Sequence, residues 1–328
     1  METFLIAEAC DNHLGSLEKA KKLAEESKLA GATAVKFQHH LPDEEMLKDV
    51  PISSNFNIPL YEFLKKYSLT LDEHYELKEF CDSINIEYMC TPFSLKAAIE
   101  INPLVKRFKI GSGEFTDIPS LVEIAKFKKQ MILSTGMSTL EEIEMVYNIL
   151  KKHTDKFSFL NCVSEYPPIF EDLNLKVITL LIKKYPDIIV GHSDHTPSIE
   201  TSLAAVTLGA KIIEKHVTLD KNIPCPDQSV SIDFDEFRLL AKCINNIEKA
   251  LGGEKTIHEK EIIIRSWARR SLVTIKDIKK GEILSKNNMW SKRPGTGIPS
   301  YLMDEYIGKR AMIDIPKNTI IEKTMLIN

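Results

Sequence analysis

The sequence has no marked excess of charge of either sign. Its 328 residues include 43 Lys and Arg against 47 Asp and Glu, a net charge of −4, so the chain as a whole is not drawn to nucleic acid or to an anionic membrane. No apolar run reaches the roughly 18 residues of a membrane-spanning helix. The N-terminus lacks the charged and apolar regions of a signal peptide. We therefore expect a cytoplasmic protein with no nucleic-acid and no membrane partner.

Cysteine is scarce, and its spacing argues against two common uses of this residue. The six cysteines lie at positions 10, 81, 90, 162, 225 and 243, where they form no CxxC motif and no even disulfide framework. This pattern is typical of free thiols in a reducing compartment. Cys10, Cys90 and Cys162 lie at the ends of apolar runs and could be metal ligands, but the favoured interpretation is that they are small buried hydrophobic residues.

Apolar runs of strand length alternate along the chain with stretches of helical periodicity. The stretches 16–30 and 139–152, for example, each place apolar residues on one helical face. Alternation of this kind predicts a parallel sheet, and eight units in about 240 residues predict an α/β fold, a closed (β/α)8 TIM barrel, over an open doubly wound sheet. The predicted strands lie at residues 3–9, 33–37, 86–91, 106–110, 130–134, 157–162, 188–191 and 211–216.

The barrel is expected to occupy residues 1–252, because an amphipathic helix at 234–251 is followed by two glycines. Residues 253–270 are charged and lack turn clusters, which predicts a linker. Within the barrel, the stretch 39–69 is rich in Asp, Glu, Pro and Asn and is too long for a plain connection between strand and helix. We expect it to cover the active-site end.

The remaining residues, 271–328, contain an internal repeat. The segment Asp277–Leu284 is echoed by Asp314–Ile321, and two copies of strand, turn and strand predict a small β-rich domain with pseudo-twofold symmetry. Between the copies, a Gly/Pro-rich loop at 292–297 presents Arg293. An arginine on such a loop is usually just solvated, but a guanidinium held near a site could clamp a phosphate or a carboxylate.

Two neighbouring apolar runs end in histidine, at His195 and His216. A helical stretch at 198–208 separates the runs, so the two imidazoles should emerge side by side at one edge of the sheet. A single histidine is more often an ordinary core or surface residue. A pair at consecutive strand ends, with Ser193 and Asp194 beside it, instead favours a site for a divalent metal.

Other polar residues also follow the predicted strands, and in a TIM barrel the catalytic groups gather at these C-terminal strand ends. Lys36 and Lys109 end otherwise apolar strands, where an ammonium group is costly unless an anion or a carboxylate meets it. Two alternatives stay open: the lysines bind an anionic substrate, or they form structural ion pairs with Glu8, Glu114 or Glu214. Hydroxyl groups of the kind that cradle phosphate lie at Ser112, Ser134 and Ser193.

Taken in order, these motifs resemble the sialic acid synthase family over nearly the whole chain. The resemblance implies a TIM barrel followed by an antifreeze-like (SAF) domain. It implies an enzyme that condenses phosphoenolpyruvate with N-acetylmannosamine, or a related N-acylated aldose, to a sialic or nonulosonic acid and phosphate. The motifs are Ile6-Ala7-Glu8, Asn12-His13-Leu14-Gly15, Ala34-Val35-Lys36-Phe37-Gln38, Thr91-Pro92-Phe93, Lys109-Ile110-Gly111-Ser112-Gly113-Glu114, Leu133-Ser134-Thr135-Gly136-Met137, Ser193-Asp194-His195-Thr196, Glu214-Lys215-His216 and Arg293-Pro294-Gly295.

The resemblance also implies roles for single residues. His195 and His216 match the family's metal ligands, for Mn²⁺ with Mg²⁺ or Co²⁺ as alternatives. The residues that match the phosphoenolpyruvate pocket are Lys36, Lys109, Ser112, Ser134 and Ser193. The residues that match the sugar-facing set are Glu8, Gln38, Glu114, Tyr166 and Asp227.

Further implications concern the second domain and the departures from the family pattern. Arg293 resembles the arginine that the SAF domain delivers into the barrel of its partner, which implies a domain-swapped homodimer. Trp267 lies where family members often face the acyl group of the sugar. The chain has Ser164 where relatives often carry Asn or Thr, so we expect one hydrogen bond to phosphate or carboxylate to be rearranged there. Cys10 and Asp11 replace a more usual small apolar pair.

The expected mechanism follows from where charge develops. The metal polarises the aldehyde of the sugar while the enol carbon of phosphoenolpyruvate attacks it, and Glu8 or Glu114 moves the proton of the water that adds next. Lys36 and Arg293 offset the phosphate charge. Legionaminic or pseudaminic acid synthesis, from a 2,4-diacetamido-2,4,6-trideoxy hexose, is the alternative. A metal-dependent aldolase, which would release no phosphate, and a non-catalytic binding module are remoter alternatives.

Overall fold

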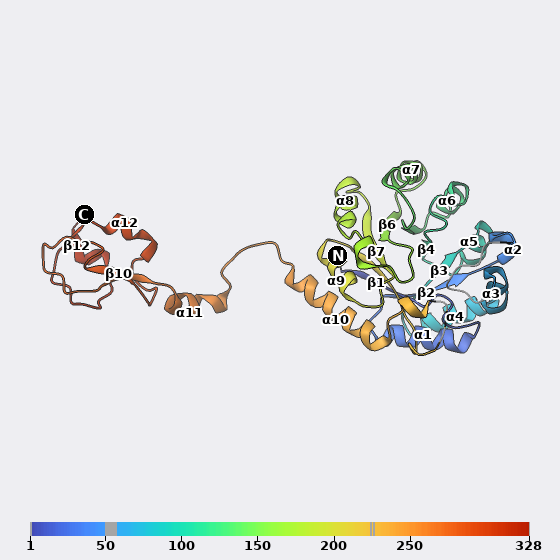
Figure 1. Ribbon diagram of the computed structural model, residues 1–328, viewed down its shortest axis with the longest axis horizontal. Helices are drawn as coiled ribbons and strands as arrows, with labels where there is room; N and C mark the ends of the chain where they lie inside the picture. Colours follow the sequence, from blue (N-terminus) through green and yellow to red (C-terminus); the bar gives the residue numbers. More distant parts are fainter. Residues whose placement is uncertain (1, 50–57, 224, 226, 328) are drawn as a thin grey trace. The chain divides into compact units, whose positions relative to one another are not determined.

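The computed structural model describes residues 2–49, 58–223, 225 and 227–327. The chain divides into two compact units, Met1–Gly252 and Gly253–Asn328. The first unit carries the alternating strands and helices, and the second is small (Figure 1). The stretch 253–270, expected to be a linker, lies in the second unit and includes helix α11 (Glu259–Ala268).

Eight parallel strands close into a barrel in which β8 pairs with β1, so the TIM-barrel prediction is confirmed. All eight predicted strands are present. Three of them end later than predicted, at His39, Pro92 and Asp194. In the first and the last, strand pairing continues past the apolar run into polar residues that the barrel buries. The strands are β1 (Phe4–Glu8), β2 (Ala34–His39), β3 (Glu87–Pro92), β4 (Arg107–Ile110), β5 (Gln130–Ser134), β6 (Phe157–Cys162), β7 (Ile189–Asp194) and β8 (Ile212–His216).

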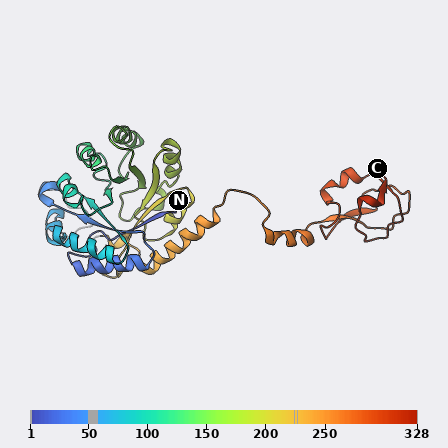
Figure 2. The same ribbon diagram turned by 180° about the vertical axis from the view of Figure 1, so that it is seen from behind.

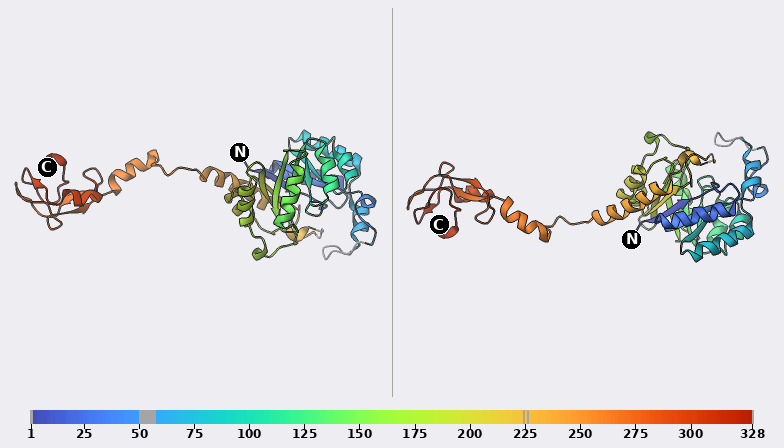
Figure 3. Two further views of the ribbon diagram at one scale, coloured as in Figure 1. Left: turned by 90° about the horizontal axis from the view of Figure 1, so that it is seen from above. Right: turned by 90° about the horizontal axis from the view of Figure 1, so that it is seen from below.

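Helices surround the barrel, as Figures 2 and 3 show from other directions. Local sequence signals set their first turns: the Ser16 side chain caps α1, and Thr139 forms a reciprocal capping box with Glu142 at the start of α7. None of the helices that the structure describes is long and apolar enough to cross a membrane. The helices of the barrel are α1 (Leu17–Leu29), α4 (Leu71–Ser83), α5 (Leu95–Ile101), α6 (Ile118–Ala125), α7 (Leu140–Leu150), α8 (Lys176–Lys184), α9 (Glu200–Thr207) and α10 (Phe234–Ala250).

The inside of the barrel is filled by an apolar layer that forms the floor of the active-site end. Each of its six residues lies two positions before a polar or thiol residue on the same strand face, because side chains of a strand alternate between its two faces. Ile6 is thus followed by Glu8, and Ile212 by Glu214. The layer comprises Ile6, Ala34, Met89, Ile132, Leu160 and Ile212.

The long connection after β2 holds two short helices, α2 (Pro42–Glu45) and α3 (Leu60–Tyr67). Residues 50–57 of this connection lie outside the described residues. The Tyr61 hydroxyl donates a hydrogen bond to Asp43 Oδ1 at 2.6 Å, which links the two helices. The connection lines one side of the cavity described below, in agreement with the expectation that it covers the active-site end.

The second unit has its own small core and two two-stranded sheets. The predicted internal repeat is visible in its hydrogen bonds. Equivalent residues Ile278 and Ile315 exchange backbone hydrogen bonds at 2.9 and 2.8 Å, and Asp277 and Asp314 each accept from the backbone N–H of the opposite copy, at 2.7 Å. The remaining elements are β9 (Ser271–Thr274), β10 (Met289–Lys292), α12 (Met303–Tyr306), β11 (Arg310–Ala311) and β12 (Leu326–Ile327).

Gly191 on β7 lies level with the apolar floor, where there is no room for a side chain. A Cβ at this position would lie 2.4 Å from the carbonyl oxygen of Ile212 and 2.5 Å from a methyl carbon of Leu160. We therefore predict that Gly191→Ala lowers the free energy of unfolding by at least about 1–3 kcal/mol, the usual cost of overpacking. Denaturant unfolding monitored by circular dichroism measures this loss.

The matched control is Gly252→Ala, because a Cβ at Gly252 has nothing within 4 Å. If Gly191→Ala and Gly252→Ala both unfold at the wild-type denaturant concentration, the close approach of β7 and β8 does not exclude a side chain at residue 191.

Candidate active site

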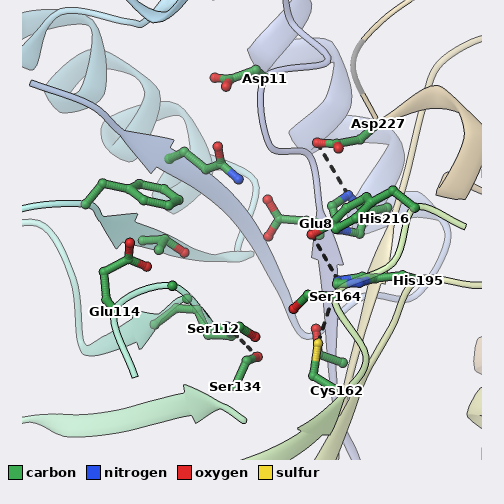
Figure 4. A pocket seen from close by; sticks show the side chains of 18 of the residues that line it. Glu8, Asp11, Ser112, Glu114, Ser134, Cys162, Ser164, His195, His216 and Asp227 are labelled. Carbon is green, nitrogen blue, oxygen red and sulfur yellow. Dashed lines mark hydrogen bonds and ion pairs between the residues drawn. The ribbon is translucent and has the colours of Figure 1, made fainter. Parts of the chain in front are cut away.

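The C-terminal ends of the strands surround a cavity of about 660 Å³. It is large enough for two small substrates, since ligand pockets typically measure ~300–1,000 Å³. Figure 4 shows its walls, with Ser112 and Ser134 on one side and His195, His216 and Asp227 on another. The residues predicted from the barrel sequence that line it are Glu8, Lys36, Gln38, Lys109, Ser112, Glu114, Ser134, Ser164, Tyr166, Ser193, His195, His216 and Asp227.

Two lysines and two carboxylates form one buried network in the cavity. Lys36 pairs with Glu8, lies 3.8 Å from Glu214 and donates to Thr91 Oγ1 at 2.9 Å. Lys109 donates to Ser134 Oγ at 2.8 Å and lies 3.6 Å from Glu214. Of the two alternatives left open by the sequence, the structure shows the ion pairs, which the lysines form with Glu8 and Glu214. Both lysines also line the cavity, and their binding of an anionic substrate stays a prediction.

Burial and charge act in opposite directions on this network. Burial raises the pKa of Glu8 to about 7, although the ammonium of Lys36 opposes the rise. Burial would also raise the pKa of Glu214, but the ammonium groups of Lys109 and Lys36 hold it below its usual value. Glu8 is thus the carboxylate of the pair that can take up or release a proton near neutral pH.

Hydroxyl and backbone groups continue the wall beside Lys109. The Gly136 N–H donates to Ser112 Oγ at 3.1 Å. A Cβ at residue 136 would lie 2.2 Å from Ser164 Oγ and 2.6 Å from Ser112 Oγ, so only glycine lets the backbone approach these hydroxyls. Together with Lys109 and Ser134, these groups form a cluster of donors suited to a phosphate.

The two histidines come together as predicted, with ring centroids 5.1 Å apart. His195 Nδ1 lies 2.8 Å from the carbonyl oxygen of Val163, so Nδ1 carries the proton and Nε2 keeps its lone pair. That nitrogen lies 3.4 Å from the Tyr166 hydroxyl and 4.0 Å from Cys162 Sγ. A histidine fixed in this way by a backbone carbonyl is typical of a metal ligand.

The residues around His216 also suit a divalent cation. Its Nδ1 is buried without a hydrogen-bond partner and lies 3.9 Å from a carboxylate oxygen of Asp227. One donor atom each from His216, Asp227 and Cys10 lie within 4.8 Å of one another. Imidazole nitrogens with a carboxylate and a thiol nearby can hold Mn²⁺, Co²⁺ or Zn²⁺. Cys10 and Cys90 are fully buried and Cys162 nearly so, which agrees with the interpretation as small hydrophobic residues. The position of Cys10 beside His216 and Asp227 also agrees with the alternative of a metal ligand.

A second buried ion pair lies on the outer face of the two histidine-bearing strands. Asp194 and Lys215 are paired in strand register, and their charged groups lie 3.2 Å apart with both side chains fully buried. Asp194 also accepts hydrogen bonds from the hydroxyls of Thr196, Thr201 and Ser202 at 2.6–2.8 Å. This pair ties the end of β7 to the end of β8, and so holds the neighbouring histidines in place.

Several polar residues of the cavity were not among the predicted site residues, and three of them lie together. Asp11, His40 and Glu45 line it, and their side chains are at most 9% exposed. Asp11 and His40 come shortly after predicted strands, a signal that could have found them. Glu45 comes from α2, within the connection whose fold the sequence did not predict.

Two predicted site residues, Trp267 and Arg293, belong to the second unit. The guanidinium of Arg293 lies 5.6 Å from the centre of the Trp267 ring, and its Nε donates to the carbonyl oxygen of Ala268 at 3.1 Å. Both side chains are exposed.

We predict that Asp194→Asn destabilises the barrel by about 3–5 kcal/mol at neutral pH, because it leaves the ammonium of Lys215 buried without a counter-charge. The Lys215 ammonium and nearby hydroxyls hold the pKa of Asp194 below its usual value, although burial would raise it. Its contribution to stability is therefore present above the unfolded pKa of about 4 and is lost progressively as the pH falls from there through the lower folded pKa. Denaturant unfolding between pH 7 and pH 3 should show a constant gap between wild type and variant down to about pH 4 and a narrowing gap below it.

The control for this prediction is Asp155→Asn, an exposed aspartate that pairs with Lys151 on the surface. It should cost at most about 1 kcal/mol. Equal losses in the two variants would contradict the structural role given to the buried pair.

Comparison with known proteins relates this geometry to a family. Residues 23–256 match the NeuB family, and residues 269–327 match the SAF domain. The chain is 41% identical to N,N'-diacetyllegionaminic acid synthase of Campylobacter jejuni, covering 98% of this chain and 99% of that protein. It is 39% identical to a pseudaminic acid synthase of the same species, covering 96% and 94%.

A solved structure shares the fold. The crystal structure of N-acetylneuraminic acid (sialic acid) synthetase from Leptospira borgpetersenii in complex with citrate superimposes with a TM-score of 0.74 at 33% identity, covering 80% of this chain and 90% of that chain. The family resemblance noted from the sequence is thereby confirmed. The chain belongs to the NeuB family of sialic acid synthases and carries a SAF domain after its barrel.

Proposed function

We propose that the protein condenses phosphoenolpyruvate with an N-acylated aldose and water to give a nonulosonic acid and phosphate. The observation that carries the proposal is one cavity in which a lysine- and serine-lined wall adjoins two imidazoles. The lysine- and serine-lined wall suits the phosphate and carboxylate of phosphoenolpyruvate. The two imidazoles suit a metal that would bind the aldehyde oxygen. The names of the synthases most similar to this chain, given above, support the same reaction.

Phosphoenolpyruvate is proposed to bind beside Lys36 and Lys109. The ammonium groups are already held in place by ion pairs with Glu8 and Glu214. The anion would therefore bind to charges that are in position before it arrives. Ser112, Ser134 and Ser164 would donate hydrogen bonds to its oxygens from the wall that includes Gly136, and Ser193 from the next strand. Preorganised donors of this kind stabilise the charge that the leaving phosphate develops.

A divalent metal is proposed to be held by His195 and His216, with Mn²⁺ as the first choice. The fit rests on the lone pair left on His195 Nε2 and on the unpartnered nitrogen of His216 next to Asp227. When bound, the ion would act as a Lewis acid toward the aldehyde oxygen. Tyr166 and Asp227 would orient the sugar beside it.

The bond changes balance as follows. The enol carbon of phosphoenolpyruvate forms a bond to the aldehyde carbon, and water adds to the phosphate-bearing carbon. One proton of the water passes through a carboxylate to the former aldehyde oxygen, which becomes a hydroxyl group. The carbon–oxygen bond to phosphate then breaks, its electron pair leaves with phosphate, and loss of the second proton of the water gives the ketone. Glu8 is our candidate for taking the proton from the water, because its pKa of about 7 lets it act as a base near neutral pH. Glu114, which also lines the cavity and whose pKa burial raises, is the alternative.

We also propose that Arg293 and Trp267 complete the barrel site of a second copy, in a domain-swapped homodimer. Exposed apolar residues of α11 support an assembly, because Ile262, Ile263 and Ile264 are 57%, 72% and 51% exposed in the single chain.

Phosphoenolpyruvate is a cytoplasmic metabolite, so we propose the cytoplasm as the location.

The test is phosphate release by the purified protein loaded with Mn²⁺. Phosphoenolpyruvate is supplied with N-acetylmannosamine in one arm and with a 2,4-diacetamido-2,4,6-trideoxy hexose in the other. We expect release that depends on a sugar and that a chelator abolishes. Release with no sugar would replace the proposal by a phosphatase. Product formation from pyruvate without phosphate release would replace it by an aldolase.

Lys36→Ala should lower kcat/KM for phosphoenolpyruvate by about 100- to 1,000-fold, since it removes one charged donor worth roughly 3–4 kcal/mol in the transition state. Steady-state phosphate release measures the change. The matched control is Lys21→Ala, a lysine of α1 that pairs with Glu76 on the surface. Unchanged turnover in Lys36→Ala would remove Lys36 from the proposed mechanism.

A further inference from the structure

The cavity has a second wall that the proposed chemistry does not use. It is formed mainly by the end of β2 and by the connection that follows, with Asp11 from the loop after β1 and Phe93 from the loop after β3. It combines polar and apolar groups. Figure 4 shows Asp11, a polar member of this wall, on the side of the cavity away from His195 and Cys162. Its apolar members are Met46, Leu60, Leu64 and Phe93.

The polar part of this wall is a chain of hydrogen bonds that ends at Gln38. His40 Nδ1 lies 3.0 Å from Glu45 Oε2, and His40 Nε2 lies 3.0 Å from Gln38 Oε1 and 3.7 Å from Asp11 Oδ2. Acceptors therefore face both ring nitrogens, which makes both of them donors. Because His40 donates to the amide oxygen of Gln38, the amide nitrogen of Gln38 is the part left to donate to a ligand.

His40 is held in place from two further directions. Its ring stacks on Phe93, with centroids 4.2 Å apart and planes inclined by 19°. Glu45, its partner at Nδ1, also accepts a hydrogen bond from the backbone N–H of Leu41, which anchors the carboxylate to the start of α2. Gln38 is thus oriented by a side chain that is itself fixed by α2 and by Phe93, the residue after β3.

An amide donor beside an apolar surface suits an acetamido group. The carbonyl oxygen of such a group accepts a hydrogen bond from Gln38, and its methyl group packs against Met46, Leu60 and Leu64. A hydroxyl group at the same place would accept the hydrogen bond but leave the apolar surface uncovered. The proposed aldehyde site is at the histidines, so an acetamido group on the carbon next to the aldehyde stays near them. An acetamido group on carbon 4, two carbons further along the sugar, lies farther from the aldehyde and is the one that would meet the second wall.

We propose that this second wall, through Gln38 positioned by His40 and Glu45 and through Leu60, selects an acceptor sugar with an acetamido group at carbon 4. The inference rests on the proposed function, and it makes a 2,4-diacetamido-2,4,6-trideoxy hexose the preferred acceptor over N-acetylmannosamine, which has a hydroxyl at that carbon. His40 is a positioning residue here, since it acts through Gln38.

The polar half is tested by two substitutions of His40. Glutamine places an amide nitrogen where Nε2 is and keeps the donor to Gln38, whereas asparagine places it where Nδ1 is and keeps only the partner at Glu45. We expect His40→Asn to raise the KM for the diacetamido sugar about tenfold, equivalent to about 1.4 kcal/mol, with the KM for phosphoenolpyruvate unchanged. His40→Gln should stay within about threefold of wild type. Equal effects of the two substitutions, or a change in the KM for phosphoenolpyruvate, would overturn the positioning role.

The apolar half is tested by Leu60→Ala, with Leu47→Ala as the matched control from the same connection. Leu47 is 83% exposed and does not line the cavity. We expect Leu60→Ala to lower kcat/KM for the diacetamido sugar at least about tenfold, the usual effect of lost methyl contacts in a pocket. Its effect on N-acetylmannosamine should be under threefold, and Leu47→Ala should change neither. Thermal unfolding of each variant confirms that it is folded.

The outcomes separate the inference from the proposed function. If the wild type releases phosphate with N-acetylmannosamine but not with the diacetamido sugar, the proposed reaction stands and the selection of a carbon-4 acetamido group is wrong. If Leu60→Ala affects both sugars equally, the wall does not read that group. If no sugar supports release, the proposed function itself fails.

Discussion

The structure depends most on a layer of buried charge at the C-terminal ends of the strands. Lys36 and Lys109 lie with Glu8 and Glu214 inside a barrel whose next layer is wholly apolar. Each of these groups alone would cost several kcal/mol to bury. Opposite charges offset that cost, and the result is a set of fixed charges in a site of low polarity. An anionic substrate meets ammonium groups that need not reorganise, which is the condition under which electrostatic catalysis is most effective.

Strand register is what brings this layer together. Glu8 lies opposite both Lys36 and His216 in the barrel, and Ser193 lies opposite Glu214. Because side chains alternate, the residues between them point outward. On β7 and β8 those outward residues are Asp194 and Lys215, a second charge pair that is dry and fully hydrogen-bonded. The same strands thus carry an inner pair of histidines for chemistry and an outer ion pair for rigidity.

Much of this could be predicted from the sequence, and the reasons are physical. Strands are short apolar runs and their ends in a parallel barrel share one edge, so Lys36, Lys109, His195 and His216 were placed together correctly. The partner of each lysine could not be chosen, since Glu8 and Glu214 lie on strand ends and Glu114 follows one, and only the closed register selects Glu8 and Glu214. Glu45 was missed because it comes from a short helix in a connection without periodicity, whose fold depends on contacts such as that with His40, the residue after β2.

The position of Glu45 shows that two kinds of segment contribute to the cavity. The groups given to the chemistry come from the strand ends, where the backbone is held on both sides and a displacement of 1 Å would be costly. The groups that read the far end of the sugar come largely from an inserted connection, held by a few contacts such as Tyr61 to Asp43 and His40 to Glu45. A connection can change length and side chains without disturbing the barrel register. In this chain the proposed reaction centre and the proposed selection of the acceptor therefore lie on different segments, and the second segment can change without disturbing the first.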